Sequence, residues 1–128
     1  MKQSSILLVE DEHQQRELLT MMLEAEGYEV TATATAEEAF QRLISAPPRL
    51  VITDVKLPGI DGFSLFDQAR SNKASSRVPF IFITGYNDDQ AIERVRRLGA
   101  LGYITKPYEV EDLLGMVRRH MPASGTAA

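Results

Sequence analysis

The sequence of 128 residues predicts a doubly wound α/β fold, in which helices cover both faces of a parallel sheet. Two observations support this prediction. Four short apolar runs, typical of strands buried in a parallel sheet, and one alternating segment are interspersed with segments whose apolar residues recur at helical spacing. The connections between successive runs are long enough for the crossover helices that parallel strands require. We therefore expect a strand followed by a helix, repeated five times, in a single domain.

Most of the expected strands are continuous apolar runs, and one alternates. In residues 28–32 the side chains of Tyr28, Val30 and Ala32 alternate with polar ones, as in a half-exposed edge strand. The continuous runs are residues 6–9, 50–52, 80–83 and, more weakly, 101–104.

The expected helices follow apolar stripes that repeat at intervals of three and four residues, which places their members on one helix face. A shorter candidate helix spans residues 63–70, and Met21 is expected to pack in the interior. The stripes are Leu18, Met22 and Ala25; Ala36, Ala39, Phe40 and Leu43; Ala91, Val95 and Leu98; and Val110, Leu113, Leu114, Val117 and Met121.

Capping signals mark the ends of several of these helices. Thr35 and Asn87 are each followed three residues later by Glu or Gln, which resembles a capping box at a helix start. Gly27 and Gly99 stand where helix C-caps are expected, because glycine readily adopts the left-handed conformation.

Composition narrows the possible functions. Eighteen acidic residues against 14 basic ones give a net charge of −4, which disfavours direct binding to nucleic acid. The absence of cysteine excludes thiolate ligands and nucleophiles. No apolar run approaches the ~20 residues of a membrane helix, so we expect no membrane contact and a cytoplasmic location. The domain is expected to span residues 1–121, with residues 122–128 as a disordered tail or the start of a linker.

Charged and hydroxyl side chains follow the expected strands where each strand ends. Glu10 and Asp11 follow the first run, Asp54 the third, Thr84 the fourth and Lys106 the fifth. The carboxyl ends of parallel strands meet at one edge, where ligands of doubly wound sheets bind, so we expect these side chains to converge. Clustered carboxylates are tolerable when a divalent cation binds between them, because its charge outweighs their repulsion.

With the segment LPGIDG soon after Asp54 and with Pro107 after Lys106, these residues resemble the receiver domain of two-component response regulators. The resemblance covers residues 4 to about 121. It implies a flavodoxin-like three-layer sandwich with strand order 2-1-3-4-5. It also implies a signalling domain, not an enzyme, which receives a phosphoryl group from a sensor histidine kinase or phosphotransfer protein in the presence of Mg²⁺ or Mn²⁺.

The resemblance assigns roles to the acidic residues. Asp54 is the expected phosphoacceptor and also a metal ligand. Asp11 is expected to bind the metal directly, Glu10 through water, and the backbone carbonyl of Lys56 to complete the protein ligands. Simpler interpretations remain open, since Asp54 could be a structural strand-end residue and Asp11 could cap the first helix. Glu12 is expected only to cap that helix.

The resemblance also implies a set of contacts to the phosphoryl group. Thr84 donates its hydroxyl, Lys106 pairs with the phosphoryl oxygens or with Asp54, and Gly85 leaves room. The peptide bond between Lys106 and Pro107 is expected to be cis, which directs the amine inward.

Tyr103 corresponds to the switch aromatic of the family. We expect phosphorylation to draw Thr84 inward, Tyr103 to follow, and the surface of the fourth helix, fifth strand and fifth helix to change for an output partner or a homodimer. Simple strand packing is the alternative for Tyr103. Lys56 and Tyr86 are expected to tune the lifetime of the phosphate, with Tyr86 hindering the attacking water.

Other features leave alternatives open. One group of basic residues is either a solvated face or a contact for a partner or a second receiver: Arg94, Arg96 and Arg97 of the fourth helix with Arg118 and Arg119 of the fifth. A pseudo-receiver that only binds proteins, and a metal-dependent phosphatase, remain rival functions, although the phosphatase would normally carry D-x-D after the first strand. A flavin-binding module would need a Gly/Ser/Thr-rich phosphate loop where Glu10, Asp11 and Glu12 stand.

Overall fold

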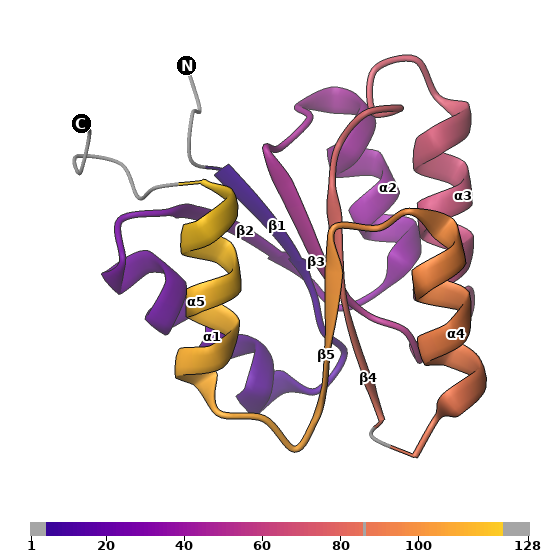
Figure 1. Ribbon diagram of the computed structural model, residues 1–128. Helices are drawn as coiled ribbons and strands as arrows, with labels where there is room; N and C mark the ends of the chain where they lie inside the picture. Colours follow the sequence, from indigo (N-terminus) through magenta and orange to yellow (C-terminus); the bar gives the residue numbers. More distant parts are fainter. Residues whose placement is uncertain (1–4, 86, 122–128) are drawn as a thin grey trace.

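The structure, a computed structural model, describes residues 5–85 and 87–121. Strands and helices alternate in the expected order (Figure 1). Among the described residues, no helix is long and apolar enough to cross a membrane. The expected tail, residues 122–128, lies outside the described part of the chain. The elements are β1 (Ser5–Val9), α1 (His13–Ala25), β2 (Glu29–Thr33), α2 (Ala36–Ser45), β3 (Leu50–Asp54), α3 (Gly62–Ser71), β4 (Phe80–Gly85), α4 (Asp89–Leu98), β5 (Gly102–Lys106) and α5 (Val110–His120).

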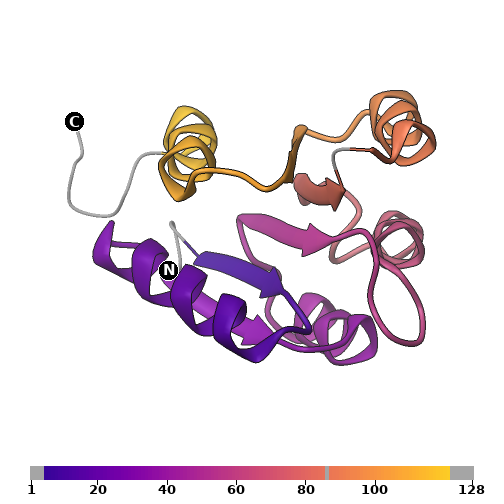
Figure 2. The ribbon, with the colours of Figure 1, turned by 90° about the horizontal axis from the view of Figure 1, so that it is seen from below.

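The five strands form one parallel sheet in the order β2-β1-β3-β4-β5. Helices α1 and α5 lie on one face of the sheet, and α2, α3 and α4 lie on the other (Figures 1 and 2). The flavodoxin-like prediction is therefore confirmed, including the order of the strands. In this topology β1 and β3 are neighbours at the point where the strand order reverses.

Each face of the sheet has its own hydrophobic core. On the α2–α4 face, aromatic rings dominate, with Phe66 edge-on to Phe80 at a centroid distance of 5.0 Å and Phe63 5.2 Å from Phe82. On the other face, aliphatic residues of α1 and α5 pack on β1, β3 and β4. Both faces of the central strands are thus buried, which explains why their sequences are continuous apolar runs.

The buried face of α1 differs from the predicted stripe. Leu19 and Leu23 are fully buried, whereas Leu18 is 42% exposed, Met22 36% and Met21 65%. The predictions that Leu18 and Met22 form the buried stripe and that Met21 packs in the interior are wrong. Apolar residues stand side by side in this helix, so two helical phases fit the sequence equally well. Only the position of α1 against the sheet selects one of them.

The edge strand β2 also departs from its predicted alternation. Tyr28 is 3% exposed but precedes the strand, and its hydroxyl donates a hydrogen bond of 2.8 Å to the carbonyl of Met121. Ala32 is exposed and Thr33 is buried, the reverse of the expected pattern. Val30 packs against the core on the α1 face of the sheet. Ala32 points to the same face two residues later, near the end of the strand, but is exposed there.

The helix caps follow the sequence at three of the four expected positions. Thr35 Oγ1 accepts the Glu38 N–H at 3.1 Å and begins α2. Gly27 and Gly99 have φ angles of 99° and 75°, in the left-handed region where glycine is favoured. The cap of α4 is Asp88, which accepts the Ala91 N–H at 3.0 Å, so the prediction of Asn87 is wrong.

Candidate functional site

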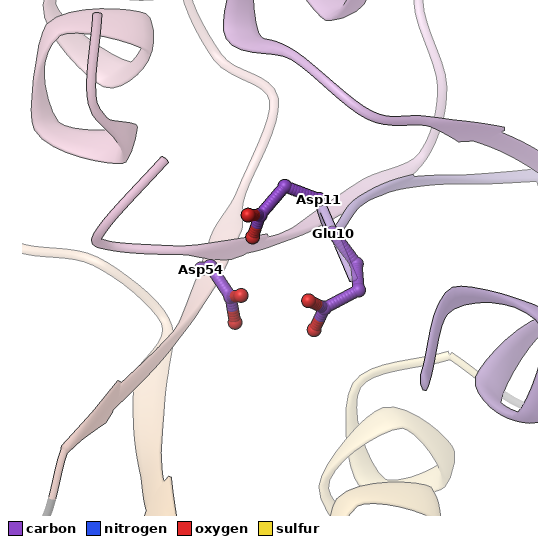
Figure 3. A group of neighbouring side chains, drawn as sticks. All are labelled: Glu10, Asp11 and Asp54. Atoms are coloured by element: carbon purple, nitrogen blue, oxygen red, sulfur yellow. The ribbon is translucent and has the colours of Figure 1, made fainter. Parts of the chain in front are cut away.

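Three carboxylates converge at the edge of the sheet where β1 and β3 end. One carboxylate oxygen from each of Glu10, Asp11 and Asp54 lies within 4.8 Å of the other two. Figure 3 shows the three side chains turned toward a common space. Glu10 and Asp54 are 1% and 3% exposed, whereas Asp11 is exposed. The expected convergence of strand-end acids is therefore present.

Asp54 is held in place by its strand and by a close backbone approach. It pairs in register with Ile83 of β4, and the Val55 N–H after it donates to the Ile83 carbonyl at 2.9 Å. Gly62, which begins α3, lies so close that an added Cβ would stand 2.3 Å from the Asp54 carbonyl oxygen. Glycine at this position therefore lets α3 start directly against the loop that follows β3.

The turn that carries the other two acids is fixed by hydrogen bonds. The Glu10 N–H donates to the Thr33 carbonyl at 3.0 Å, and Glu10 Oε2 accepts the Glu12 N–H at 3.0 Å. Glu12 caps α1 as expected, accepting the Gln15 N–H at 2.7 Å. Arg16 Nη1 donates to the backbone carbonyl of Glu10 at 3.0 Å. These contacts hold the Glu10 carboxylate inward despite its charged neighbours.

Two buried carboxylate oxygens at this edge accept no hydrogen bond. They are Glu10 Oε1 and Asp54 Oδ1, identified among the residues that the structure describes. A buried oxygen without a partner is costly, and native proteins usually satisfy such atoms with protein groups, water or ions. The arrangement therefore fits a cation between the carboxylates.

Lys106 supplies the positive charge of the site. Its Nζ lies 3.3 Å from Asp54 Oδ2, and the peptide bond to Pro107 is cis, as expected. Burial lowers the pKa of Lys106, but the charges of Asp54 and Glu10 outweigh that effect and raise the pKa above its ordinary value. The lysine is therefore firmly cationic at neutral pH.

The Asp54 carboxyl is destabilised in its charged form in the metal-free protein. Burial and the charge of Glu10 raise the pKa of Asp54 to about 7, and the attraction of Lys106 only partly offsets them. A cation bound between the carboxylates would reverse this balance, because it favours the charged form.

The other predicted site residues differ in their burial and in their contacts. Thr84 is buried on β4, one residue before Gly85, where an added Cβ would meet no atom within 4 Å. The Lys56 side chain is exposed. Tyr103 lies half-buried on β5, with its hydroxyl bonded to α4 and not to the acids. Tyr86 lies outside the described residues.

One contact near the site was not predicted from the sequence. Tyr108, two residues after Lys106, accepts a hydrogen bond of 2.9 Å from Gln15 of α1 on its hydroxyl. Burial is the largest cause of the raised pKa of Tyr108, and the nearby carboxylates of Glu10 and Asp54 add to it. An aromatic residue just after the Lys-Pro pair was the available signal, but its partner lies 93 residues away in the sequence.

The chain is similar in sequence and in fold to known proteins. The family model described as response regulator receiver domain matches residues 6–118. The chain is 30% identical to sporulation initiation phosphotransferase F of Bacillus subtilis, over 95% of this chain and 97% of that protein. It is 38% identical to phosphate regulon transcriptional regulatory protein PhoB of Rhizobium meliloti, over 88% of this chain and 50% of that protein. The non-phosphorylated HemR receiver domain of Leptospira biflexa superposes with a TM-score of 0.83 at 31% identity, covering 97% of this chain and 98% of that one.

Proposed function

Because this chain belongs to the response regulator receiver domain family, we propose that it is a signalling domain that accepts a phosphoryl group on Asp54. The observation that carries the proposal is the buried Asp54 carboxylate, with one oxygen 3.3 Å from Lys106 and the other without a partner. Phosphoryl transfer depends mainly on positioning and on neutralised charge, and this site offers both.

A divalent cation, Mg²⁺ or Mn²⁺, fits the acidic residues. The two unpartnered buried oxygens and the 4.8 Å cluster support it, since hard cations prefer oxygen ligands. Asp11 and Asp54 would bind it directly, Glu10 through water, and Lys56 through its backbone carbonyl. When bound, the cation would supply positive charge that neutralises the phosphoryl oxygens.

The residues of this chain supply the nucleophile for phosphoryl transfer and the contacts to the transferred group. An Asp54 carboxylate oxygen forms the new bond to phosphorus as the nitrogen–phosphorus bond of the donor phosphohistidine breaks, and the imidazole leaves with the bonding electron pair. Lys106 binds phosphoryl oxygens once Asp54 is esterified. Thr84 donates its hydroxyl to the same group, and the free space at Gly85 accommodates it. Lys56 tunes the lifetime of the phosphate, and Tyr86 is proposed to hinder the attacking water.

The exposed side of α1 supports a docking site for the phosphodonor. Leu18, Met21 and Met22 leave 42%, 65% and 36% of their surfaces uncovered, and α1 begins at the acidic edge next to Asp11. Residues three and four apart share one helix face, so these side chains offer a partner an apolar contact surface. A sensor histidine kinase or a phosphotransfer protein docked there would bring its phosphohistidine to Asp54.

Phosphorylation would change the surface formed by α4, β5 and α5, and a partner would recognise that change. Thr84 and Tyr103 lie on neighbouring strands, and a phosphoryl group that attracts Thr84 would free space into which Tyr103 can turn. The phosphate can shift this equilibrium only by binding the two states with different affinity. The changed surface would then control an output domain or a separate partner.

The direct test is to treat the protein with Mg²⁺ and acetyl phosphate and to follow its intact mass. We expect one added phosphoryl group on the wild type, none after removal of Mg²⁺ with EDTA, and none on Asp54→Ala. Modification of Asp54→Ala to the wild-type extent would contradict the proposal. Metal binding without any modification of the wild type would favour a pure protein-interaction module, and turnover of free phosphomonoesters would favour a phosphatase.

A further inference from the structure

The ring of Tyr103 is held by a residue of the preceding helix. Arg96 Nη2 donates a hydrogen bond of 3.2 Å to the Tyr103 hydroxyl, and the guanidinium carbon lies 5.9 Å from the ring centroid. Gly99, with φ of 75°, ends α4 and turns the chain back toward β5, which brings the two residues together. Arg96 is exposed and Tyr103 is half-buried, so the contact lies at the surface.

The strand register places Tyr103 on the same face of the sheet as Thr84. Phe82 pairs with Tyr103 and Thr84 pairs with Thr105, and residues two apart on a strand point to the same face. Tyr103 packs against the hydrophobic core on the α2–α4 face, which includes Phe82 and the α4 residue Val95. A movement of the ring along the sheet toward Thr84 would take its hydroxyl away from Arg96.

We propose that Arg96 is a positioning residue that holds Tyr103 in its observed, half-buried position while Asp54 is unmodified. The inference rests on the proposed function, because it concerns regulation of the same site. The hydrogen bond and the cation–π contact are made in the observed position of the ring, so they stabilise that position relative to one in which the ring has turned toward Thr84. By linkage, removing them makes the switched state easier to reach and raises affinity for a phosphoryl group at Asp54.

Neither of the other two arginines of α4 has a described contact with Tyr103, so one of them can serve as a matched control. Arg94 lies over the ring of Phe63 at 4.4 Å and 4.0 Å from Asp67. Arg97 is exposed on the same turn as Arg96, and within the described part of the chain it makes no hydrogen bond, ion pair or ring contact with Tyr103. Arg97→Met therefore removes an equal charge from the same helix without touching the proposed contact.

The test uses the whole chain labelled with fluorotyrosine and ¹⁹F NMR. The Tyr103 signal is assigned by its loss in Tyr103→Phe, and the spectra of the wild type, Arg96→Met and Arg97→Met are compared without ligand. We expect Arg96→Met alone to move the Tyr103 signal toward its position in the protein with Mg²⁺ and beryllofluoride. Titration with beryllofluoride should show about two- to fivefold tighter binding for Arg96→Met, the range expected for loss of one exposed hydrogen bond.

Two results would overturn the inference. One is a Tyr103 signal in unliganded Arg96→Met that coincides with those of the wild type and Arg97→Met. The other is an equal gain in beryllofluoride affinity when Arg96→Met is placed in the Tyr103→Phe background, because the hydroxyl contact is then already absent. A wild type that does not respond to Mg²⁺ and beryllofluoride at all would contradict the proposed function, whereas the unliganded comparison would still decide the contact of Arg96.

Discussion

Lys106 Nζ lies 3.3 Å from Asp54 Oδ2, although 52 residues separate them in the sequence. The contact joins the ends of β3 and β5, with β4 between them in the sheet. It is the only ion pair of Asp54 among the described residues, and it places the amine where a phosphoryl group on Asp54 would need a counter-charge.

Replacement of this lysine should slow phosphorylation strongly. Lys106→Met keeps the unbranched stem of the side chain and removes its charged amine, so we expect the rate of modification by acetyl phosphate to fall by about tenfold or more, since charge-assisted contacts are worth ~1.5–3 kcal/mol. The rate is measured by intact mass. Lys73→Met, at an exposed loop residue, should leave the rate unchanged. Equal rates for both variants would argue against a role of the amine.

The raised pKa of Asp54 predicts how stability changes with pH in the metal-free protein. The folded-state pKa is about 7, whereas an unfolded aspartate titrates near ~3.9. The folded state therefore binds the proton of Asp54 more tightly than the unfolded state does. Protonation of Asp54 contributes its full stabilisation below about pH 4, and this stabilisation is lost as the pH rises through about 7. In EDTA, Asp54→Asn should be more stable than the wild type by about 1–3 kcal/mol at pH 8, with a smaller difference at pH 5.

Urea unfolding at both pH values measures this difference. Mg²⁺ should stabilise the wild type at pH 8, because it binds only the folded site, and should affect Asp54→Asn less. A wild type that gains stability between pH 5 and 8 relative to Asp54→Asn would show that the carboxyl is not held in its neutral form.

The close approach of α3 to β3 predicts an intolerant glycine. In Gly62→Ala the added methyl would stand 2.3 Å from the Asp54 carbonyl oxygen, so the backbone must shift. We expect a loss of about 2 kcal/mol or more in the free energy of unfolding, in the range of overpacked sites. Gly85→Ala meets no atom within 4 Å and should change stability little. Similar stability losses for the two variants would contradict the packing argument.

The exposed apolar side of α1 predicts a variant that separates protein-mediated from chemical phosphorylation. Leu18→Gln should slow transfer from a histidine kinase that phosphorylates the wild type by about fivefold or more, because an interface residue that contributes to binding costs more than ~1 kcal/mol when it is lost. Its reaction with acetyl phosphate should stay unchanged. Leu101→Gln, at a leucine that is 45% exposed outside α1, is the control. Equal slowing with both phosphodonors would place Leu18 in folding or chemistry instead of docking.

Much of the fold was predictable because it follows from local patterns. Continuous apolar runs identified the buried strands, and Thr35, Gly27 and Gly99 marked helix ends through interactions within a few residues. The position of Asp54 at a strand end was also local information. The order 2-1-3-4-5 came from resemblance to a family, and the structure confirms it.

The sequence by itself determined which segments are strands and helices, and that the acids and Lys106 lie at one edge of a parallel sheet. Only the tertiary structure decided which side of α1 is buried, since adjacent apolar residues allow two phases. Only it showed the unpartnered oxygens of Glu10 and Asp54 and the contact of Arg96 with Tyr103. The reason is physical: periodicity and capping act within a turn or two, whereas these features depend on how separate elements pack against one another.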